Sequence, residues 1–329
     1  MCFFMSPSTN RYAVLDLGTN IFHLLIVELN DSNEGFKTIY KEKVPVKIGE
    51  GGISQGIINE VAEKRIMQAF TRFSSTLQSY EIPSQKIFAT ATSAFRNAHN
   101  GQTIAQQIQQ NFGITIDIIG GNQEATYIYE GVRRAVPMKN QTALIMDIGG
   151  GSVEFILAND SKVFWKKSFE IGGQRLADKY MRTDPISQLD LQRMEIYLET
   201  ALFELTQVLF SHIPQMLIGS AGAFETIIAM TEQMNKETTI QTDEHGEMTE
   251  KAVRIDRNDF YKLYQQVIVR NLEQRKAIEG MLDLRADMIV VAMALIKFII
   301  EKTNPQNIFA SAYSLKEGIL FNKILDVRC

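Results

Sequence analysis

Two aspartates stand in the same short pattern at widely separated points of the chain. Asp16 follows the apolar run 12–15, Asp147 follows the apolar run 143–146, and each is followed two residues later by a glycine. Strands disfavour Asp, so each carboxylate marks the end of a strand, and the glycine lets the backbone of the next turn approach a ligand closely. Carboxylates and backbone N–H groups arranged in this way are suited to hold a phosphate chain and its metal ion.

The turn after Asp147 differs from two commoner phosphate-binding motifs. It consists of Gly149, Gly150 and Gly151. The residues from Ser152 to Ala158 then alternate between the two faces of a strand. A Walker loop needs a Lys and a Ser or Thr after its glycines, and a dinucleotide-binding turn needs a helix there. The sequence therefore predicts a hairpin.

The first half of the chain repeats this hairpin, and its second strand is predicted at 21–29. Asp147 lies 131 residues after Asp16 (147 − 16), and Gly149 lies the same distance after Gly18. Two copies at this spacing indicate two domains rather than a solenoid, and 329 residues are enough for two cores. We therefore expect two related α/β domains that hold their ligand in a cleft between them.

Strands and helices alternate along the rest of the chain. Periodicity predicts further strands at 36–48, 87–90, 114–119, 163–170, 215–219 and 308–312. It predicts helices at 61–77, 102–111, 123–136, 189–210, 222–230, 260–269, 285–301 and 315–325, and one after Gly173. The polar residues 231–251 read as a surface excursion.

Composition excludes several classes of function. A net charge of −4 gives no general reason to bind nucleic acid or an anionic membrane, so local arginines, backbone amides and metal would hold an anionic substrate. The two cysteines, Cys2 and Cys329, cannot form a disulfide framework or a thiolate metal site. Residues 1–5 lack the features of a signal peptide, and no run approaches transmembrane length. We expect a soluble cytoplasmic protein.

Taken in order, the motifs resemble those of the exopolyphosphatase and guanosine pentaphosphate phosphohydrolase (Ppx/GppA) family, in the actin, Hsp70 and sugar kinase superfamily. The resemblance rests on residues 16–20 with Phe22 and His23, 89–94 with Arg96, 124–125, 147–154, 219–222, 285–287 and 317–318. The length, and the lack of a His-Asp pair suited to a helical extension, resemble the short two-domain form.

The resemblance implies an α/β fold of two duplicated actin-like, ribonuclease H-like domains around a central cleft. The first domain would cover 1–122, with the helix 314–329 returning to it, and the second would cover 123–313. The implied activity is release of terminal phosphate from inorganic polyphosphate or from the 5′ end of pppGpp.

The resemblance also implies roles for single residues. The catalytic carboxylates would be Glu124, which orients and deprotonates the attacking water, and Glu154. Asp16, Asp147 and Glu154 would hold Mg²⁺, or another divalent cation, directly or through water. Arg96 would clamp the terminal phosphate. The other implied substrate-binding residues are Thr19, Asn20, Ser93, Gly149, Gly150, Gly151, Ser152, Gly219 and Gly222.

Several of these residues also have purely structural readings. Asp often forms turns, and a Glu in the first turn of a helix is favoured by the helix dipole. Arg96 could be a solvated surface charge and Glu154 the polar face of a hairpin. Gly219 and Gly222 serve close helix packing as readily as phosphate contact. His23, on an apolar strand, reads as a core histidine.

The chain departs from the family pattern at four positions. Ile21 stands where a second hydroxyl residue is usual, Ala221 and Ala223 replace Gly and Thr, and Lys316 replaces Arg. These departures bear on affinity and substrate range. They leave open a non-catalytic regulator that binds polyphosphate or an alarmone.

Hydrolysis is the leading interpretation of the sequence. An ATPase or kinase of the same fold is a further alternative, but such proteins usually carry extra segments that are not visible in this sequence. The expected partners are polyphosphate or guanosine penta- or tetraphosphate, without nucleic acid or membrane. A homodimer is left open.

Overall fold

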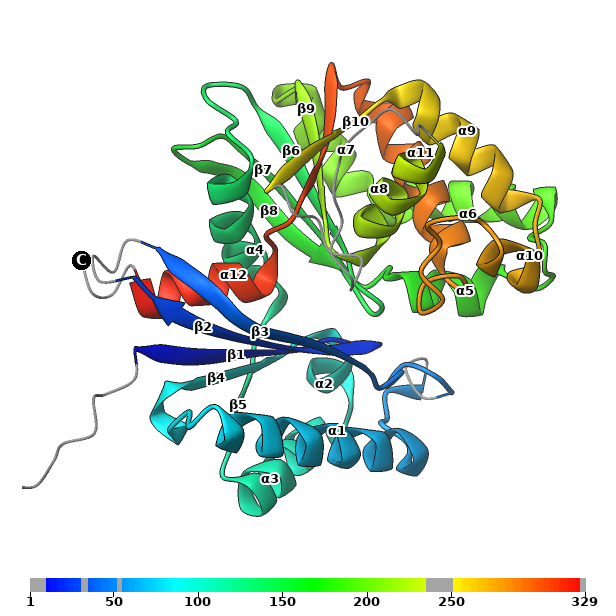
Figure 1. Ribbon diagram of the computed structural model, residues 1–329. Coiled ribbons are helices and arrows are strands. Elements are labelled where there is room, and N and C mark those ends of the chain that lie inside the picture. The colour runs from blue at the N-terminus through cyan, green and yellow to red at the C-terminus, as the bar shows by residue number, and fades with distance from the viewer. Residues whose placement is uncertain (1–9, 31–34, 52–54, 235–250, 326–329) are drawn as a thin grey trace, which may run out of the picture. The chain divides into compact units, whose positions relative to one another are not determined.

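The computed structural model describes residues 10–30, 35–51, 55–234 and 251–325. The chain divides into two compact units, of which unit 1 comprises residues 1–120 and 319–329 and unit 2 comprises residues 121–318. The later boundary falls inside helix α12 (Leu315–Leu320), whereas the sequence placed it before residue 314. Each unit has its own sheet and helices (Figure 1).

Unit 1 is built on a sheet of strand order β3-β2-β1-β4-β5. Its strands are β1 (Arg11–Leu17), β2 (Ile21–Leu29), β3 (Phe36–Pro45), β4 (Ile87–Ala91) and β5 (Ile116–Ile118). β1, β2 and β3 are antiparallel, and β4 and β5 run parallel to β1. The helices are α1 (Glu60–Ser79), α2 (Ser93–Asn97) and α3 (Gly101–Phe112). The core lies between one face of the sheet and α1, where Leu15 packs with Phe70 and Phe73.

Unit 2 has a sheet of order β10-β11-β9-β6-β7-β8. Its strands are β6 (Ala143–Ile148), β7 (Val153–Ala158), β8 (Val163–Phe169), β9 (Met216–Ser220), β10 (Ala252–Ile255) and β11 (Asn307–Ser311). Its helices before α12 are α4 (Gly121–Ala135), α5 (Gly173–Tyr180), α6 (Gln188–Ala201), α7 (Phe203–Ser211), α8 (Gly222–Met234), α9 (Arg257–Ile268), α10 (Leu272–Lys276) and α11 (Ile289–Thr303). α4 covers one face of the sheet, and α8, α9 and α11 cover the other (Figure 1).

The two sheets confirm the duplication that the paired aspartates predict. β1, β2, β3, β4 and β5 correspond in order and direction to β6, β7, β8, β9 and β11, and unit 2 adds β10 at the edge. Asp16 and Asp147 each occupy the penultimate position of the equivalent strands β1 and β6. The fold is mixed α/β, as expected.

The predicted helix 189–210 is wrong in one respect, because it divides into α6 and α7 at Leu202. Leu202 is fully buried, so the apolar periodicity of the sequence continues across the break. The sequence pattern therefore does not reveal that the helix is interrupted. The predicted helix 285–301 also begins too early. Residues 284–287 form turns, and α11 starts at Ile289.

Smaller differences concern the ends of elements. Gly121 opens α4 instead of forming a turn before it, and the last predicted helix continues after α12 as the π-helix Phe321–Leu325. β10 and α10, of four and five residues, were not predicted because they are too short to show a period. Residues 235–250 of the expected surface excursion lie outside the described residues.

Candidate active site

Four polar side chains form a row across the sheet of unit 2. Ser220 of β9, Asp147 of β6, Glu154 of β7 and Ser168 of β8 are register partners from each strand to the next. Partners in a ladder share one face of the sheet, with Cβ atoms about 5 Å apart. Two carboxylates therefore lie side by side with a hydroxyl at each end. Like charges placed directly opposite destabilise a sheet, so positive charge close to this pair is stabilising.

Asp147 is held by two serines at a single oxygen. Ser220 Oγ donates to Asp147 Oδ2 at 2.5 Å, and Ser314 Oγ donates to the same oxygen at 2.7 Å. Oδ1 accepts no hydrogen bond from the described residues, which leaves it available to a metal ion or a bound water. Burial raises the pKa of Asp147, and the two hydroxyls and the charges of Lys316 and Arg285 oppose that rise.

Glu154 is even more deeply buried than Asp147. Only 1% of Glu154 is exposed, and Ser168 Oγ donates to its Oε1 at 2.6 Å. Buried carboxylates are rare unless they are paired or bind metal. The alternative reading of Glu154 as the solvated face of a hairpin therefore does not fit its surroundings.

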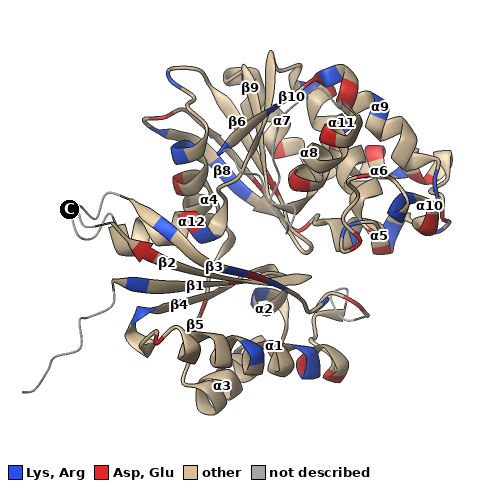
Figure 2. Ribbon diagram, in the orientation of Figure 1, with Lys and Arg blue, Asp and Glu red and all other residues tan. Residues whose placement is uncertain are grey.

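Glu124 lies in the first turn of α4, the helix that covers the face of the sheet bearing this row. Lys166 of β8 donates a hydrogen bond to Thr126 of α4, two residues after Glu124, and burial lowers the pKa of Lys166. The basic residues of β8 are visible beside α4 in Figure 2. The structure thus brings Glu124, Asp147 and Glu154 to one face of unit 2. Glu124 is itself buried.

The turn formed by Gly149, Gly150 and Gly151 is fixed from outside by the start of α5. The N–H groups of residues 172–174 donate to the three carbonyls of the turn at 2.9–3.2 Å. A Cβ on Gly172 would lie 2.4 Å from Gly150 O, so only glycine permits this approach. Ser152, at the end of the turn, is buried. The turn is therefore held in one conformation before any ligand binds.

Gly219 and Gly222 have packing partners that account for them. A Cβ on Gly219 would meet the ring of Phe224 at 2.1 Å, and one on Gly222 would meet the guanidinium of Arg285 at 1.9 Å. Both glycines therefore have a close packing contact with a side chain, and phosphate contact at either glycine stays a prediction. Ala221, between them, has a φ of 65°, in the left-handed region that favours glycine.

Unit 1 carries the equivalent row with different chemistry. Asp16 is the register partner of His23 on β2 and of Thr90 on β4. His23 therefore stands where unit 2 has Glu154, and Thr90 where it has Ser220. The sequence held this signal, because His23 and Glu154 are also 131 residues apart (154 − 23). Our interpretation of His23 as a core residue did not consider that His23 and Glu154 occupy equivalent positions of the two hairpins.

The remaining predicted residues of unit 1 follow the ends of β1 and β4. The carbonyls of Thr19 and Asn20 accept hydrogen bonds from residues 46–48 at 2.8–2.9 Å, which fixes the turn after Asp16. Ser93 opens α2 and is buried. Arg96, on the same helix, donates from Nη1 to the carbonyl of Ile119 at 3.1 Å, which holds its guanidinium in place.

The described residues contain no cluster of three or more His, Cys, Asp or Glu side chains that could ligate a metal. Mg²⁺ does not require one, because it usually keeps several waters and binds through one or two carboxylates together with substrate phosphates. Asp147, with its open Oδ1, and its neighbour Glu154 fit that requirement. Asp16 belongs to unit 1, and its role as a ligand stays a prediction.

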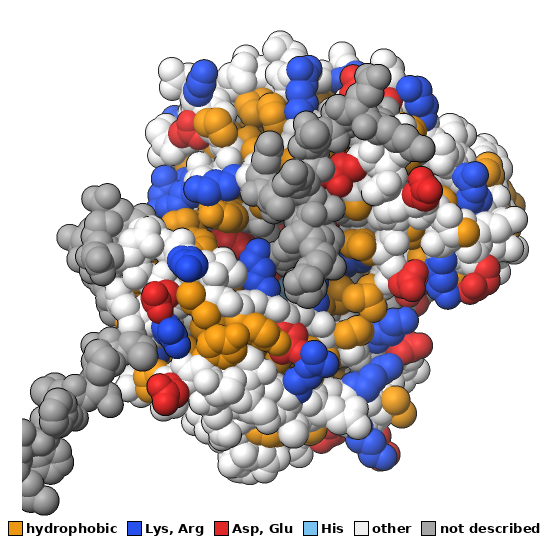
Figure 3. Space-filling model, in the orientation of Figure 1, with side chains coloured by type: hydrophobic (Ala, Val, Ile, Leu, Met, Phe, Trp, Pro, Cys, Tyr) orange, Lys and Arg blue, Asp and Glu red, His pale blue; other side chains and the backbone are white. Residues whose placement is uncertain are grey.

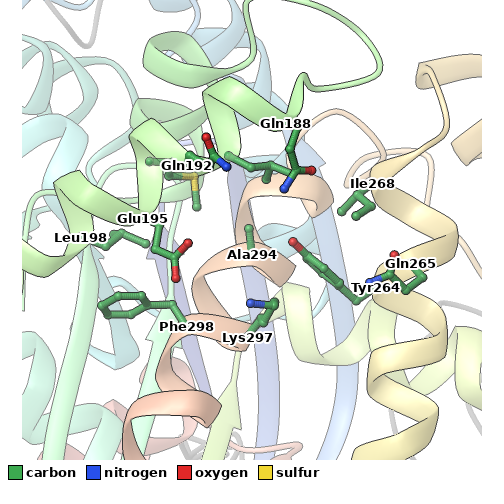
Figure 4. A pocket seen from close by; sticks show the side chains of 12 residues that line it. Gln188, Gln192, Glu195, Leu198, Tyr264, Gln265, Ile268, Ala294, Lys297 and Phe298 are labelled. Atoms are coloured by element: carbon green, nitrogen blue, oxygen red, sulfur yellow. The ribbon is translucent and has the colours of Figure 1, made fainter.

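Two hollows of unit 2 lie outside this row. One, of about 210 Å³, is bordered by α6, α9 and α11, and Glu195, Tyr264 and Lys297 point into it (Figure 4). None of the predicted site residues lines it. The other, of about 20 Å³, lies beside Gly149 and Gly150 against Arg285 and Met288. Each described helix is too short or too polar to cross a membrane.

Comparison with known proteins gives consistent matches. The model of the Ppx/GppA phosphatase family matches residues 25–327. An exopolyphosphatase crystal structure from Cytophaga hutchinsonii is 38% identical, with 96% of this chain and 98% of that chain covered and a TM-score of 0.90. The Aquifex aeolicus member of the family is 21% identical, with 97% and 99% covered and a TM-score of 0.77, and shows the same fold.

A curated relative has a different length. The bifunctional 3-dehydroquinate synthase/phosphatase of Fusobacterium nucleatum is 28% identical over 296 residues, which are 88% of this chain. This chain spans only 43% of that protein.

Proposed function

Because the chain belongs to the Ppx/GppA phosphatase family, we propose that it is a phosphoanhydride hydrolase that releases terminal phosphate from inorganic polyphosphate. The observation that carries the proposal is the buried Asp147–Glu154 pair, with one oxygen of Asp147 left open, in a chain 38% identical to an exopolyphosphatase. Burial of two adjacent carboxylates is costly unless positive charge compensates them, and a bound metal ion is a common source of that charge.

Asp147 and Glu154 would hold Mg²⁺ in this proposal. A bound Mg²⁺ neutralises charge on the phosphate oxygens, which is the main requirement of phosphoryl transfer. The chain's own groups do the rest. Ser220 and Ser314 keep Asp147 in place, and the glycine turn offers a rigid backbone for phosphate. Glu124 takes the proton of the attacking water, and Arg96 grips the terminal phosphate with its planar fork.

The solved structure that is 38% identical to this chain is that of an exopolyphosphatase, which supports polyphosphate as the substrate. On the face shown in Figure 3, acidic and basic side chains are interspersed, so binding relies on local groups. We therefore place polyphosphate ahead of pppGpp and ATP as substrate, in a cytoplasmic setting suggested by the cysteine usage.

The test is phosphate release from polyphosphate, pppGpp and ATP, each with and without Mg²⁺. We expect release from polyphosphate, dependent on Mg²⁺ and lost in Asp147→Asn. Release from ATP alone would favour the ATPase alternative. Binding of polyphosphate without any release would favour the non-catalytic regulator and would overturn the proposal.

A further inference from the structure

The helices α6 and α7 carry large apolar side chains on their outer face. Leu189, Ile196, Phe203 and Phe210 follow one another at intervals of seven residues and are 54%, 69%, 63% and 76% exposed. Ile213, just after α7, is 73% exposed. We call these five residues the α6–α7 stripe. A spacing of seven keeps side chains on one side of a helix, so α6 presents Leu189 and Ile196 on one side and α7 presents Phe203 and Phe210 on one side, the arrangement that packs against another helix.

The opposite face of the same helices already fills the core of unit 2. Met194, Leu198, Leu202 and Leu205 are buried against the sheet and its helices. A surface helix needs only one apolar face, and a helix that is apolar on two faces is normally covered on both. The stripe is therefore a surface built for contact rather than a by-product of the core.

The stripe is large enough for a specific interface. Five side chains of this size, each more than half exposed, present on the order of 600 Å² of apolar surface. Typical patches on monomers reach about 300–600 Å², and a standard interface buries about 800 Å² on each partner. The stripe therefore supplies about three quarters of the area that each partner of a standard interface buries, and its polar flanks would supply the rest.

We propose that the α6–α7 stripe is the interface between two copies of this chain, paired antiparallel about a two-fold axis that passes between Ile196 and Phe203. The stripe is graded in size, with aliphatic side chains in α6 and aromatic ones in α7. Antiparallel pairing sets Leu189 against Phe210 and Ile196 against Phe203 of the other copy. Small side chains then face large ones, which is how two surfaces fill space between them.

Charges beside the stripe fit the same arrangement. Arg193 lies three residues before Ile196 on α6, and Glu204 lies one residue after Phe203 on α7. At about 100° per residue, Arg193 is rotated about 60° around the helix axis from Ile196, and Glu204 about 100° in the same sense from Phe203, so both side chains lie on the same flank of the stripe. The two-fold axis brings Arg193 close to Glu204 of the other copy. Their side chains are 46% and 50% exposed, beside their partners Asp190 and Lys167, and can reach across. On the other flank each Glu199 is neutralised by its own Lys302 at 2.5 Å.

The first test is the mass of the full chain by sedimentation velocity, from about 1 to about 100 μM. We expect a dimer for the wild type and an association at least about tenfold weaker for Ile196→Glu with Phe203→Glu. Val61→Glu is the matched control, because Val61 is 63% exposed on α1, like Phe203, and should leave the dimer intact. A wild type that stays monomeric, or a double variant that stays dimeric, overturns the proposal.

The second test checks the orientation. Arg193→Glu places two acids together and should weaken association, and adding Glu204→Arg should restore it. Failure of the double variant to recover would overturn the antiparallel arrangement. The stripe lies outside the carboxylate row, so the rate of phosphate release per chain should be the same in the stripe variants as in the wild type. An unchanged rate also shows that these variants are folded.

Discussion

Asp147 shows how one buried carboxylate ties stability to chemistry. Burial raises its pKa above that of an ordinary Asp. Such a group stabilises the folded chain most when it is protonated, and that contribution is lost as pH rises through its folded-state pKa. Above the folded-state pKa of Asp147, the folded chain without metal therefore carries an unfavourable buried charge. Metal binding would remove the penalty, since the cation compensates the charge.

The first prediction concerns the stability of Asp147→Asn. The amide keeps an oxygen to accept from Ser220 and Ser314 but carries no charge, so the variant should be more stable than the wild type in chelator at pH 8. The advantage should shrink as pH falls and Asp147 takes up its proton. Thermal denaturation from pH 4 to 8 measures this, with Asp178→Asn, at an exposed position of α5, as control. A variant less stable than the wild type at every pH would contradict the argument.

The second prediction concerns Glu124→Gln. The change keeps size and packing and removes the charge, so a cavity cannot explain lost activity. If Glu124 takes the proton from water, hydrolysis of polyphosphate should fall on the order of 10²-fold or more. Equilibrium binding of polyphosphate should survive, because other groups hold the substrate.

Glu130→Gln is the matched control for Glu124→Gln. It removes a charge from the same helix, at a residue paired with Arg133 at 2.7 Å, and should keep its activity. Full activity in Glu124→Gln would assign the water to another group. Loss of binding together with activity would assign Glu124 to the metal.

Single residues of the site could be predicted only where a local sequence pattern identifies them. Asp16 and Asp147 interrupt apolar strands, and that interruption is visible in the sequence. Ser220 and Ser314 do not interrupt their surroundings in a comparable way, so the sequence does not identify them as partners of Asp147. They act on Asp147 from 73 and 167 residues away, through strand register and the placement of α12. No local pattern reports such a contact.

At the scale of elements, strand ends were predicted well and some helix starts were not. β2 begins and ends where the sequence predicted, because its apolar run is bounded by turn residues on both sides. α11 starts four residues later than its apolar pattern predicts. Arg285 instead lies in a turn, with its guanidinium against Gly222. The apolar pattern of the sequence carries no information about this contact between distant segments.

The third prediction concerns the turn between β9 and α8. Ala221 has a φ of 65°, where a non-glycine residue costs about 1–2 kcal/mol. Replacing Ala221 by Gly removes this cost, but glycine is more flexible in the unfolded chain, and the extra entropy that it loses on folding offsets part of the gain in stability. Ala221→Gly should therefore stabilise the chain, by up to about 1 kcal/mol in denaturant unfolding. Ala223→Gly, in the first turn of α8, should destabilise it by a similar amount. Destabilisation by both would show that the turn is unstrained.

At the scale of the molecule, two units repeat one sheet order but not one site. Each unit has its own apolar core and its own row of polar residues on equivalent strands. Unit 2 supplies two carboxylates in its row, whereas unit 1 supplies Asp16 beside His23. The duplication kept the aspartate and changed its neighbour. That difference predicts unequal contributions of the two units to metal binding.

The last prediction asks whether the two aspartates act on one ion. If they do, Asp16→Asn and Asp147→Asn should be non-additive in Mg²⁺ affinity, with a coupling of about 1 kcal/mol or more, roughly fivefold. Independent residues add to within about 0.3–0.5 kcal/mol. Mg²⁺ titration of the two single variants and the double variant measures the coupling, and Asp16→Asn with Asp178→Asn is the additive control. Asp147→Asn should weaken binding more than Asp16→Asn, because it breaks the carboxylate pair. Additive effects would assign the metal to unit 2 alone, with Asp16 left as the residue that ends β1.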